Sequence, residues 1–497
     1  MKTKHVIVIG AGIGGLVAAL DLARRGLRVS VYERFDQPGG KMREIEVEGH
    51  PIDAGPTVFT MPWIFESLFA DAGTRLTDHL SIRPAELVAR HAWQSGGSLD
   101  LFADAERSEA AIHQFAGPEE ARRYRDFSAH AKQVFQTLYG PYIQSRKPSP
   151  LSLVADSGLR GLMELWRIHP FETLWRRLGK YFQDPRLRGL FARYATYCGS
   201  DPLQAPATLM LIAHVEQLGV WQIEGGMHCL AKALTGLIRE HGGSVTFNAG
   251  VGELEARSGL INGVRLESGE RVAGDIVIAN ADVASLQHGH LGRSAVSALP
   301  HRRRENRSLS AVTWSMLAET SGFDLSHHNV FFPDDYPQEF IDIFRDQRLP
   351  DRPAVYICAQ DRSPGATPPR GRERLFMIAN SPANGDQLTL DSDTRSRLEA
   401  AVFGLLKDCG LEIGRSLDHR VMTTPSDFES MFPGTGGALY GTATHGWRAS
   451  FTRPTARSRT RGLYLTGGGI HPGAGVPMVA ISGRLAAQTV ANDLGLH

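Results

Sequence analysis

The sequence has few of the features that assign a chain to a broad class at once. Its 497 residues include only four cysteines, which lie far apart and form no CxxC pair: Cys198, Cys229, Cys358 and Cys409. This spacing argues against a zinc site or a disulfide framework and is typical of a reducing compartment. The net charge of +1 at pH 7 gives no electrostatic reason to expect nucleic acid as a partner.

Long hydrophobic runs are also missing. No uninterrupted apolar run reaches the roughly 18 residues that a membrane-spanning helix requires. The first apolar run passes directly into glycines without a small-residue cleavage site, so we interpret it as a strand and not as a signal peptide. We therefore expect a cytoplasmic protein, either free or attached to a membrane surface. The length predicts two or three substructures.

What is present begins with "HVIVIGAGIGG" at residues 5–15, a strand followed by a glycine turn. A helical pattern comes next, and then a second strand, "RVSVYE", that ends at Glu33. In a dinucleotide-binding βαβ unit, Gly10 permits the tight turn, Gly12 lets the backbone approach a pyrophosphate, and Gly15 lets the helix pack on the sheet. Glu33 would accept hydrogen bonds from the adenosine ribose. The pattern predicts a Rossmann-type nucleotide domain.

A second glycine turn favours FAD over NAD as the bound dinucleotide. "RFDQPGGKMRE" follows Glu33 directly and contains Gly40 and Lys41, and "DAGPT" follows at residues 53–57. A plain NAD domain continues into another helix here, whereas an extended dinucleotide would continue along such turns. GxGxxG also occurs only once, and a flavoenzyme reduced by NAD(P)H normally needs a second such fold. We therefore predict bound FAD that is reoxidised by something other than a nicotinamide.

The C-terminal stretch "TGGGIHPGAGVPM" at residues 466–478 has the composition of a cofactor cradle. So many glycines are entropically costly unless the backbone must come close to another group. We expect Gly467–Gly469 to follow a strand beside the first one and to approach the pyrophosphate or ribityl part of FAD. A helix then begins near Val476, with Pro477 in its first turn. Its N-terminus would point at the flavin N1–C2 edge, where negative charge develops on reduction.

The middle of the chain contains a strand-rich insertion. "ELEARSGLINGVRLESGERVAGDIVIAN" alternates like an antiparallel sheet, with turn signals at Ser258-Gly259, Asn262-Gly263 and Ser268-Gly269. It returns to the nucleotide domain at residues 275–282, and the backbone near Val251 suits the adenine edge. Further along, "AVYICAQ" and "RLFMIAN" are typical of buried strands in a substrate-domain sheet.

Residues from about 108 to 218 are predicted to be helical. Between Gly158 and Arg193, eight Arg or Lys residues outnumber three Asp or Glu. Aromatic residues alternate with them: Trp166, Phe171, Trp175, Tyr181, Phe182 and Phe191. Such a composition suits an anionic membrane surface, and the alternative is a solvated helical subdomain whose aromatics form its core.

No residue stands out as the catalyst. The sequence shows no Ser-His-Asp set, no paired carboxylates at helical spacing and no metal-ligand cluster, so the chemistry is assigned to the flavin itself. His471 is a candidate acid or base, but we favour a role in ordering its loop by hydrogen bonding or stacking. His228 in "GGMHC" is expected near the cradle without a chemical role.

Together these residues resemble the carotenoid desaturase family, the phytoene-desaturase-like branch of the amine-oxidase-type flavoproteins. The resemblance extends over essentially the whole chain and includes "YCGSDPLQAPATLMLIAHVEQLGVWQIEGGMHCLAKAL", "TTPSDFESMF" and "GLYLTGGGIHPGAGVP". It implies that FAD contacts Gly10, Gly12, Gly15, Glu33, Lys41, Gly55, Val251, Gly468, Val476 and Pro477. The neighbours Gly14, Gly40, Pro56, Thr57, Gly467 and Met478 in the same motifs complete the candidate site.

The family's fold is α/β, α+β overall, and implies three parts. A discontinuous Rossmann-type FAD-binding domain is expected over residues 1–75, 208–295 and 455–497. A mixed-sheet substrate domain is expected over residues 76–107 and 296–454, and a helical lid or membrane-contact subdomain over residues 108–207.

Within the family, "HPGAGVPM" and "GPTVFTMPW" resemble the hydroxycarotenoid 3,4-desaturases, also called methoxyneurosporene dehydrogenases. That resemblance implies hydride transfer from an allylic carbon of an acyclic 1-hydroxycarotenoid to flavin N5, in spheroidene- or spirilloxanthin-type pigment synthesis. It also implies quinone or oxygen as electron acceptor and peripheral attachment to the inner or photosynthetic membrane. The alternatives are a phytoene desaturase, oxygenase or isomerase of the same fold, an amine oxidase, or a non-enzymatic escort protein of the GDP-dissociation-inhibitor type.

Overall fold

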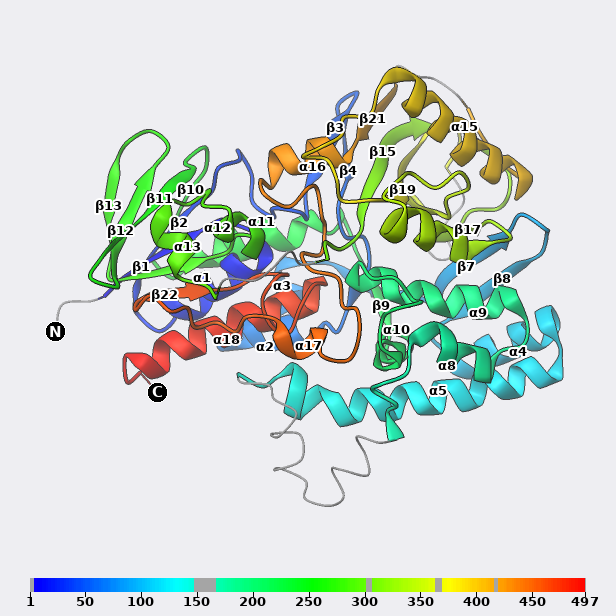
Figure 1. Ribbon diagram of the computed structural model, residues 1–497, viewed down its shortest axis with the longest axis horizontal. Helices are drawn as coiled ribbons and strands as arrows, with labels where there is room; N and C mark the ends of the chain where they lie inside the picture. The colour runs from blue at the N-terminus through cyan, green and yellow to red at the C-terminus, as the bar shows by residue number, and fades with distance from the viewer. Residues whose placement is uncertain (1–3, 147–166, 301–305, 363–368, 415–418, 497) are drawn as a thin grey trace.

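Five parallel strands from distant parts of the chain form the first sheet. The computed structural model describes residues 4–146, 167–300, 306–362, 369–414 and 419–496 (Figure 1). The strand order is β10-β2-β1-β14-β22, and every neighbouring pair is parallel. The strands are β1 (His5–Ile9), β2 (Arg28–Tyr32), β10 (Ser244–Thr246), β14 (Ile276–Ala279) and β22 (Leu463–Leu465). The discontinuous Rossmann-type domain is therefore confirmed.

The order of these strands corrects one prediction. The strand before the C-terminal glycines, β22, does not lie beside β1, because β14 is inserted between them. All four residues of β14 are buried, and its two edges pair with β1 and β22, so it occupies a central position that sequence proximity does not reveal.

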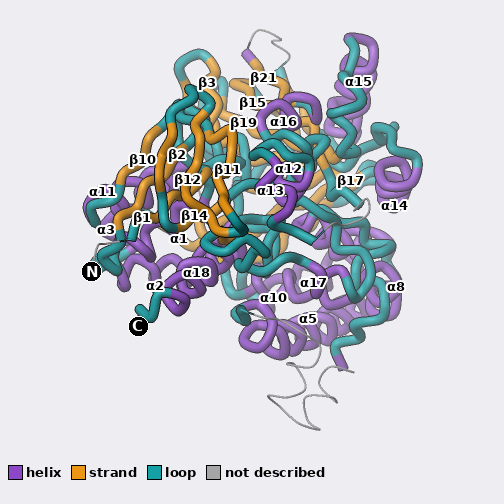
Figure 2. Tube along the Cα trace, turned by 60° about the vertical axis from the view of Figure 1, so that its left-hand side comes forward, coloured by secondary structure: helices purple, strands orange, loops and turns teal. Residues whose placement is uncertain are grey.

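Layers on both faces bury this sheet. Val6 and Val8 of β1 point into a core with α1 (Ile13–Ala23), α11 (His228–Glu240) and α18 (Val476–Asp493), whereas Ile7 and Ile9 point to the opposite side. The opposite core includes the small sheet β11 (Val251–Arg257), β12 (Leu260–Leu266) and β13 (Arg271–Ala273), with α12 (Val283–Gln287) and α13 (Arg293–Ser297). Figure 2 shows α1, α2 (Trp63–Asp71) and α18 beneath the strands β1 and β14.

The small antiparallel sheet confirms two of the three predicted turns. Ser258 and Gly259, both with positive φ, connect β11 to β12, and Gly269 lies in the next turn. Asn262-Gly263 is not a turn, because it lies inside β12. Gly263 has φ +151°, and a Cβ on it would lie 2.2 Å from the Val272 carbonyl oxygen. The glycine therefore lets β13 lie close to β12 at this position.

The second sheet is mixed, as predicted for the substrate domain. Its order is β21-β15-β19-β18-β17-β7-β8, and only the β17–β7 pair is parallel. It comprises β7 (Leu87–Trp93), β8 (Ser98–Phe102), β15 (Ser310–Ala318), β17 (His328–Phe332), β18 (Val355–Ala359), β19 (Glu373–Ser381) and β21 (Arg420–Thr423), and α15 (Ser392–Asp408) packs on one face. The strands predicted at "AVYICAQ" and "RLFMIAN" are β18 and β19.

Helices gather below this sheet in Figure 1: α4 (Ala105–Ala116), α5 (Pro118–Leu138), α8 (Leu174–Tyr181), α9 (Pro185–Ala192) and α10 (Leu211–Gln217). Phe127, Phe182 and Phe191 are fully buried among them, with the last two rings stacked at 4.8 Å. These aromatics are core residues, in agreement with the alternative interpretation of this segment, whereas Phe171 is 64% exposed. Trp166 and the rest of residues 158–166 lie outside the described residues.

Short elements complete the chain. They are β3 (Glu44–Val47), β4 (His50–Asp53), β5 (Phe59–Thr60), α3 (Leu76–His79), β6 (Ile82–Pro84), η1 (Tyr139–Ile143), η2 (Arg193–Cys198), η3 (Ala207–Met210), β9 (Val220–Ile223), β16 (Thr320–Gly322), α14 (Tyr336–Phe340), η4 (Ile341–Arg345), β20 (Leu411–Ile413), α16 (Pro425–Met431) and α17 (Ala449–Thr452). Within the described ranges, no helix has both the length and the apolar character needed to cross a bilayer.

Candidate functional site

A cavity of about 1080 Å³ lies where the two sheets and the helical part meet. Most of the predicted cofactor residues line it, although they come from five separate stretches of the chain. They are Gly10, Gly12, Glu33, Gly40, Lys41, Gly55, Pro56, Thr57, Val251, Gly467, Gly468, Val476, Pro477 and Met478. The fold therefore brings the N-terminal and C-terminal glycine motifs together on one cavity wall.

Gly14 and Gly15 are the two predicted residues that do not line the cavity. A Cβ on Gly15 would lie 2.2 Å from the Gly10 carbonyl oxygen, and one on Gly14 would lie 2.9 Å from Thr466 Oγ1. Gly15 thus allows α1 to pack closely on the sheet, as its place in the motif predicts. Gly14 lets α1 pack closely against the C-terminal turn at Thr466, so its role is in helix packing and not in lining the cavity.

Glu33 places a buried carboxylate at the end of β2. Its oxygens accept hydrogen bonds from the backbone N–H groups of Ala11, at 2.6 Å, and Phe35, at 3.0 Å. Burial raises the pKa of Glu33, and the backbone N–H donors oppose that rise. Because the side chain also lines the cavity, it is placed to accept hydrogen bonds from ribose hydroxyls.

Two helix N-termini open onto the same cavity. Gly12 caps α1 and Gly475 caps α18, and neither helix start has a side-chain cap. The first N–H groups of a helix lack partners within the helix and attract negative charge. Pro477 lies in the first turn of α18, as predicted, where its missing donor costs nothing. Both starts can therefore hold the anionic or electron-rich parts of a bound cofactor.

Lys41 connects the second glycine turn to the substrate domain. Its ammonium donates to the carbonyl oxygens of Ala438, at 3.1 Å, and Leu439, at 2.9 Å, and burial lowers its pKa. A Cβ on Gly55 would lie 2.1 Å from the Lys41 carbonyl oxygen, so this wall requires glycine. The contact fixes the turn that continues the nucleotide motif towards the second sheet.

These features fit FAD. The wall offers a buried acceptor at Glu33, two helix starts without side-chain caps, and glycine backbone at Gly12 and Gly468 that lines the cavity. The cavity then extends beyond the dinucleotide motifs. Backbone donors for a pyrophosphate and a ring edge, together with an acceptor for ribose hydroxyls, match an extended flavin dinucleotide.

His471 has the loop-ordering role favoured by the sequence analysis. Its Nε2–H donates to the Tyr142 carbonyl oxygen at 3.0 Å, and its ring meets the Tyr142 ring edge-to-face at 5.0 Å. The side chain is 2% exposed, and burial lowers its pKa to about 4. It is not among the described residues that line the cavity, so it joins the C-terminal cradle to η1.

His228 is likewise a packing residue. It is fully buried, and its ring nitrogens bond to the Glu44 carboxylate and the Pro38 carbonyl oxygen, both at 2.7 Å. These contacts hold the start of α11 against the second glycine turn.

The remaining wall of the cavity is mostly apolar and comes from all three parts of the fold. It includes Met61, Leu138, Ile143, Ile168, Leu209, Ile212, Val215, Phe376 and Ile378. At its exposed side, Phe171 and Trp447 meet edge-to-face at 5.2 Å. This half of the cavity suits a long apolar molecule.

Sequence reasoning missed a polar group in that apolar wall. Arg193, Tyr197, Glu216 and Tyr356 line the cavity together, although they belong to η2, α10 and β18. Arg193 is visible in the sequence only as one of eight basic residues in its segment, and no motif marks the group. Only the packing of the helical part on the second sheet brings these side chains together.

Tyr356 is held by neighbours on both sides. Its hydroxyl bonds to Thr57 Oγ1 at 2.6 Å and to His328 Nδ1 at 2.7 Å. His328, His327 and Cys358 form a group of potential metal ligands that the sequence analysis did not predict, with one ligand atom of each within 4.8 Å of the others. Both histidines already use Nδ1 in protein hydrogen bonds.

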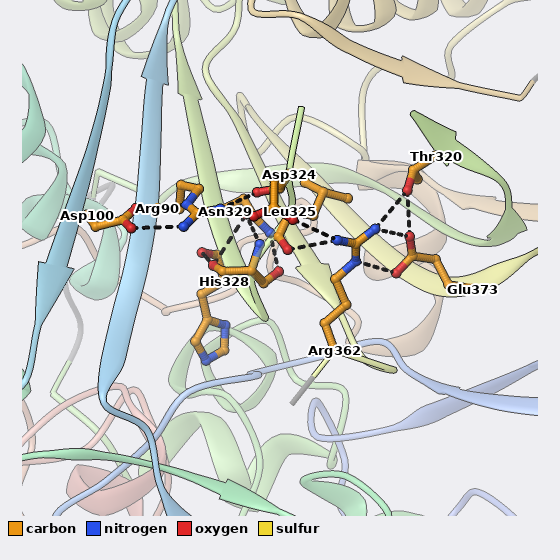
Figure 3. Close-up of polar contacts among 10 residues, drawn as sticks. Arg90, Asp100, Thr320, Asp324, Leu325, His328, Asn329, Arg362 and Glu373 are labelled. Atoms are coloured by element: carbon orange, nitrogen blue, oxygen red, sulfur yellow. Dashed lines mark hydrogen bonds and ion pairs between the residues drawn. The ribbon is translucent and has the colours of Figure 1, made fainter. Parts of the chain in front are cut away.

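An ion-pair network stabilises the strands behind this group (Figure 3). Arg90 bonds to Asp100 at 2.8 Å and to Asp324 at 2.8 Å, and Arg362 forms two hydrogen bonds with Glu373 at 2.8 and 2.9 Å. These pairs join β7 to β8 and to the loop before β17, and they join the segment after β18 to the start of β19. The ion pairs therefore stabilise the second sheet, which carries Tyr356, next to these loops.

Comparisons with known proteins place this site in a family. The family model described as "Flavin containing amine oxidoreductase" matches residues 13–491. The chain belongs to that family, and the predicted resemblance to its carotenoid-desaturase branch is confirmed. It is an FAD-dependent oxidoreductase.

The relatives include the hydroxyneurosporene desaturase of Rubrivivax gelatinosus, to which the chain is 50% identical over 99% of its length and 94% of the relative. The hydroxyneurosporene desaturase of Cereibacter sphaeroides is 42% identical over 98% of both chains. The 4,4'-diapolycopene oxygenase of Methylomonas is 30% identical over 99% of both. A solved putrescine oxidase bound to putrescine is 14% identical with a TM-score of 0.61 over 99% of both chains, which shows the shared fold alone.

Proposed function

We propose that the protein introduces a C3–C4 double bond into acyclic 1-hydroxycarotenoids. The observation that carries this proposal is an apolar cavity that continues directly from the flavin cradle. The relatives at 50% and 42% identity are named hydroxyneurosporene desaturases, which favours a hydroxylated acyclic carotenoid as the substrate.

In the proposed reaction the substrate loses a hydride from one carbon and a proton from the next. Bound FAD supplies the two-electron oxidant at N5. Glu33 and the glycine turns would hold that cofactor, and the start of α18 would stabilise negative charge on its ring. The apolar wall aligns the polyene and excludes water. Quinone or oxygen is the proposed final electron acceptor.

The exposed end of the cavity supports a proposal about location. Phe171 is 64% exposed at this end, and the side chain of the nearby Arg176 is 79% exposed. Arg176 and Arg177 both pair with Glu172, at 3.8 and 3.7 Å, but the side chain of Arg177 is only 17% exposed. Arg186 pairs with Asp184 and is 32% exposed. We propose that Phe171 and Arg176 contact the cytoplasmic surface of the inner or photosynthetic membrane, from which a carotenoid enters.

The substrate is tested with purified, FAD-loaded protein. Incubation with 1-hydroxyneurosporene, neurosporene, phytoene and 4,4'-diapolycopene in separate vesicle suspensions is followed by chromatography and mass spectrometry. We expect loss of two hydrogens and a red-shifted spectrum with 1-hydroxyneurosporene. Conversion of phytoene with no conversion of the hydroxylated substrate contradicts the proposal, and so does addition of oxygen to the diapolycopene in its place.

A further inference from the structure

Arg193 is an unusual residue for the wall of an apolar cavity. It is the first residue of η2, and its guanidinium lies 5.6 Å from the centre of the Tyr197 ring and 5.4 Å from that of Tyr356. Among the described residues, no carboxylate lies within 4 Å of it, so it has no ion-pair partner there. Arg193 is half-buried, and a cation that is partly withdrawn from solvent without such a partner is costly unless another group uses its donors.

The surroundings keep Arg193 charged. Burial acts to lower its pKa, but the hydroxyls of Tyr197, Tyr336 and Tyr356 and the Glu216 carboxylate raise it overall. Glu216 itself accepts hydrogen bonds from Tyr194 at 2.7 Å and from Tyr197 at 2.5 Å. The carboxylate is therefore occupied by phenols, and the guanidinium keeps N–H donors available to the cavity.

The position of this group relative to the cradle matches the chemistry of the proposed substrate. Tyr356, which lies against Arg193, is hydrogen-bonded to Thr57 of the cofactor wall. In a 1-hydroxycarotenoid only C2 separates the hydroxyl-bearing C1 from C3, the nearer of the two reacting carbons. A group that recognises the hydroxyl must therefore lie next to the flavin end of the cavity.

We propose that Arg193 binds the tertiary hydroxyl of the substrate and selects hydroxylated end groups. The guanidinium donates a hydrogen bond to the hydroxyl oxygen, and the Tyr197–Glu216 pair and Tyr356 hold the guanidinium in place. This assignment rests on the proposed function and adds to it the residue that determines specificity.

The test compares two substrates that differ only in that oxygen: 1-hydroxy-1,2-dihydroneurosporene and 1,2-dihydroneurosporene. The FAD-loaded full-length protein and its Arg193→Met and Arg193→Lys variants are assayed for kcat and KM. Equilibrium binding of each carotenoid is measured separately by quenching of protein fluorescence. We expect Arg193→Met to weaken binding of the hydroxylated substrate about 10- to 100-fold and that of the other less than about threefold. Arg193→Lys, which keeps a charge but not the fork of donors, gives an intermediate loss.

Arg188→Met is the matched control. Arg188 also lies over an aromatic ring, 3.9 Å from the centre of Trp175, but it is not among the described residues of the cavity wall. It should leave the preference for the hydroxylated substrate unchanged. Thr313→Val tests the rival partner, because Thr313 lines the cavity with a buried hydroxyl that has no hydrogen-bond partner in the described structure.

The outcomes separate the two proposals. If the wild-type protein does not convert the hydroxylated substrate, the proposed function itself fails. If it converts both substrates equally well, the proposed function stands and the assignment of selectivity to Arg193 is overturned. If the wild type shows the preference and both Arg193 variants retain it, or Thr313→Val alone abolishes it, the assignment to Arg193 is overturned. Should Arg193→Met not fold, as judged by flavin absorbance and melting temperature, Arg193→Lys and Tyr197→Phe decide, and unchanged preference in both overturns the assignment.

Discussion

At the residue scale, Glu33 and Arg193 set the polar character of two different parts of one cavity. Glu33 is an acceptor held by backbone N–H groups, and Arg193 is a donor held by phenols. Glu33 is buried and Arg193 is half-buried, at a cost that a bound ligand can offset, because hydrogen bonds to charged groups are stronger than those between neutral groups. Substitution of Glu33 is therefore expected to affect the binding of FAD, and substitution of Arg193 the binding of the carotenoid.

Glu33→Ala is expected to weaken FAD binding about 10- to 100-fold, because it removes a charged acceptor from the cavity wall. Flavin content after gel filtration and titration of the apoprotein with FAD measure the loss. Glu270→Ala, in the exposed turn before β13, is the control and should bind FAD normally. Full flavin occupancy in Glu33→Ala would show that the carboxylate only accepts the backbone hydrogen bonds of Ala11 and Phe35 and does not bind FAD.

His471 makes a prediction about pH. Its folded-state pKa is lowered to about 4, so the unfolded chain takes up a proton as pH falls below the ordinary value near 6.5, while the folded protein resists it. The stability contribution is therefore complete above about pH 6.5 and is lost as pH falls towards 4, by up to about 3 kcal/mol. His471→Gln keeps a donor for the Tyr142 carbonyl oxygen without a titrating ring.

Melting temperature measured from pH 7 to pH 4.5 checks this. The wild type is expected to lose more stability over that range than His471→Gln, since the buried His91 and His445 remain in both proteins. Parallel curves for the two proteins would contradict the assignment. At pH 7 the His471 imidazole is neutral and lies outside the cavity wall, so His471→Gln is expected to leave the rate of desaturation nearly unchanged.

At the element scale, the close packing of α1 against α18 positions both helix starts at the cavity. A Cβ on Gly483 of α18 would lie 2.5 Å from the Gly14 carbonyl oxygen and 2.9 Å from Val17 Cβ. Such contacts cannot form without movement of one helix. The glycines at this crossing therefore matter to the cofactor although they do not touch it.

Gly483→Ala is expected to destabilise the protein by about 1–3 kcal/mol and to weaken FAD binding, because α18 must shift away from α1. Gly236→Ala in α11 is a matched control, since a Cβ there has nothing within 4 Å and a helix favours alanine over glycine. Thermal melts with and without added FAD compare the two. Equal melting temperatures in both variants would show that the helices can part without cost.

At the scale of the whole molecule, the cavity connects the nucleotide sheet to the helical part at the opposite side of the fold. If that exposed end contacts an anionic membrane, the double variant Phe171→Ser, Arg176→Glu should float less with phosphatidylglycerol vesicles than the wild type does. Arg271→Glu, on the distant strand β13, should float like the wild type. Equal flotation of all three proteins would contradict membrane contact at this end.

Much of the cofactor wall could be predicted from sequence, because its parts are local. GxGxxG, the turn at Gly40 and the start of α18 at Val476 each depend on backbone geometry within a few residues. Fourteen of the sixteen predicted cofactor residues accordingly line one cavity, and the other two pack beneath it. The limits of the six domain segments stay predictions.

The sequence by itself determined the cofactor class and the discontinuous nucleotide domain, since these follow from short motifs, and the family resemblance of the same motifs implied the mixed second sheet. Only the tertiary structure decided that β14 separates β1 from β22, that Gly263 lies within a strand, and that Arg193 faces the cavity. The physical reason is that strand order, register and the burial of a single charge depend on contacts between residues far apart in the chain. No local pattern records those contacts.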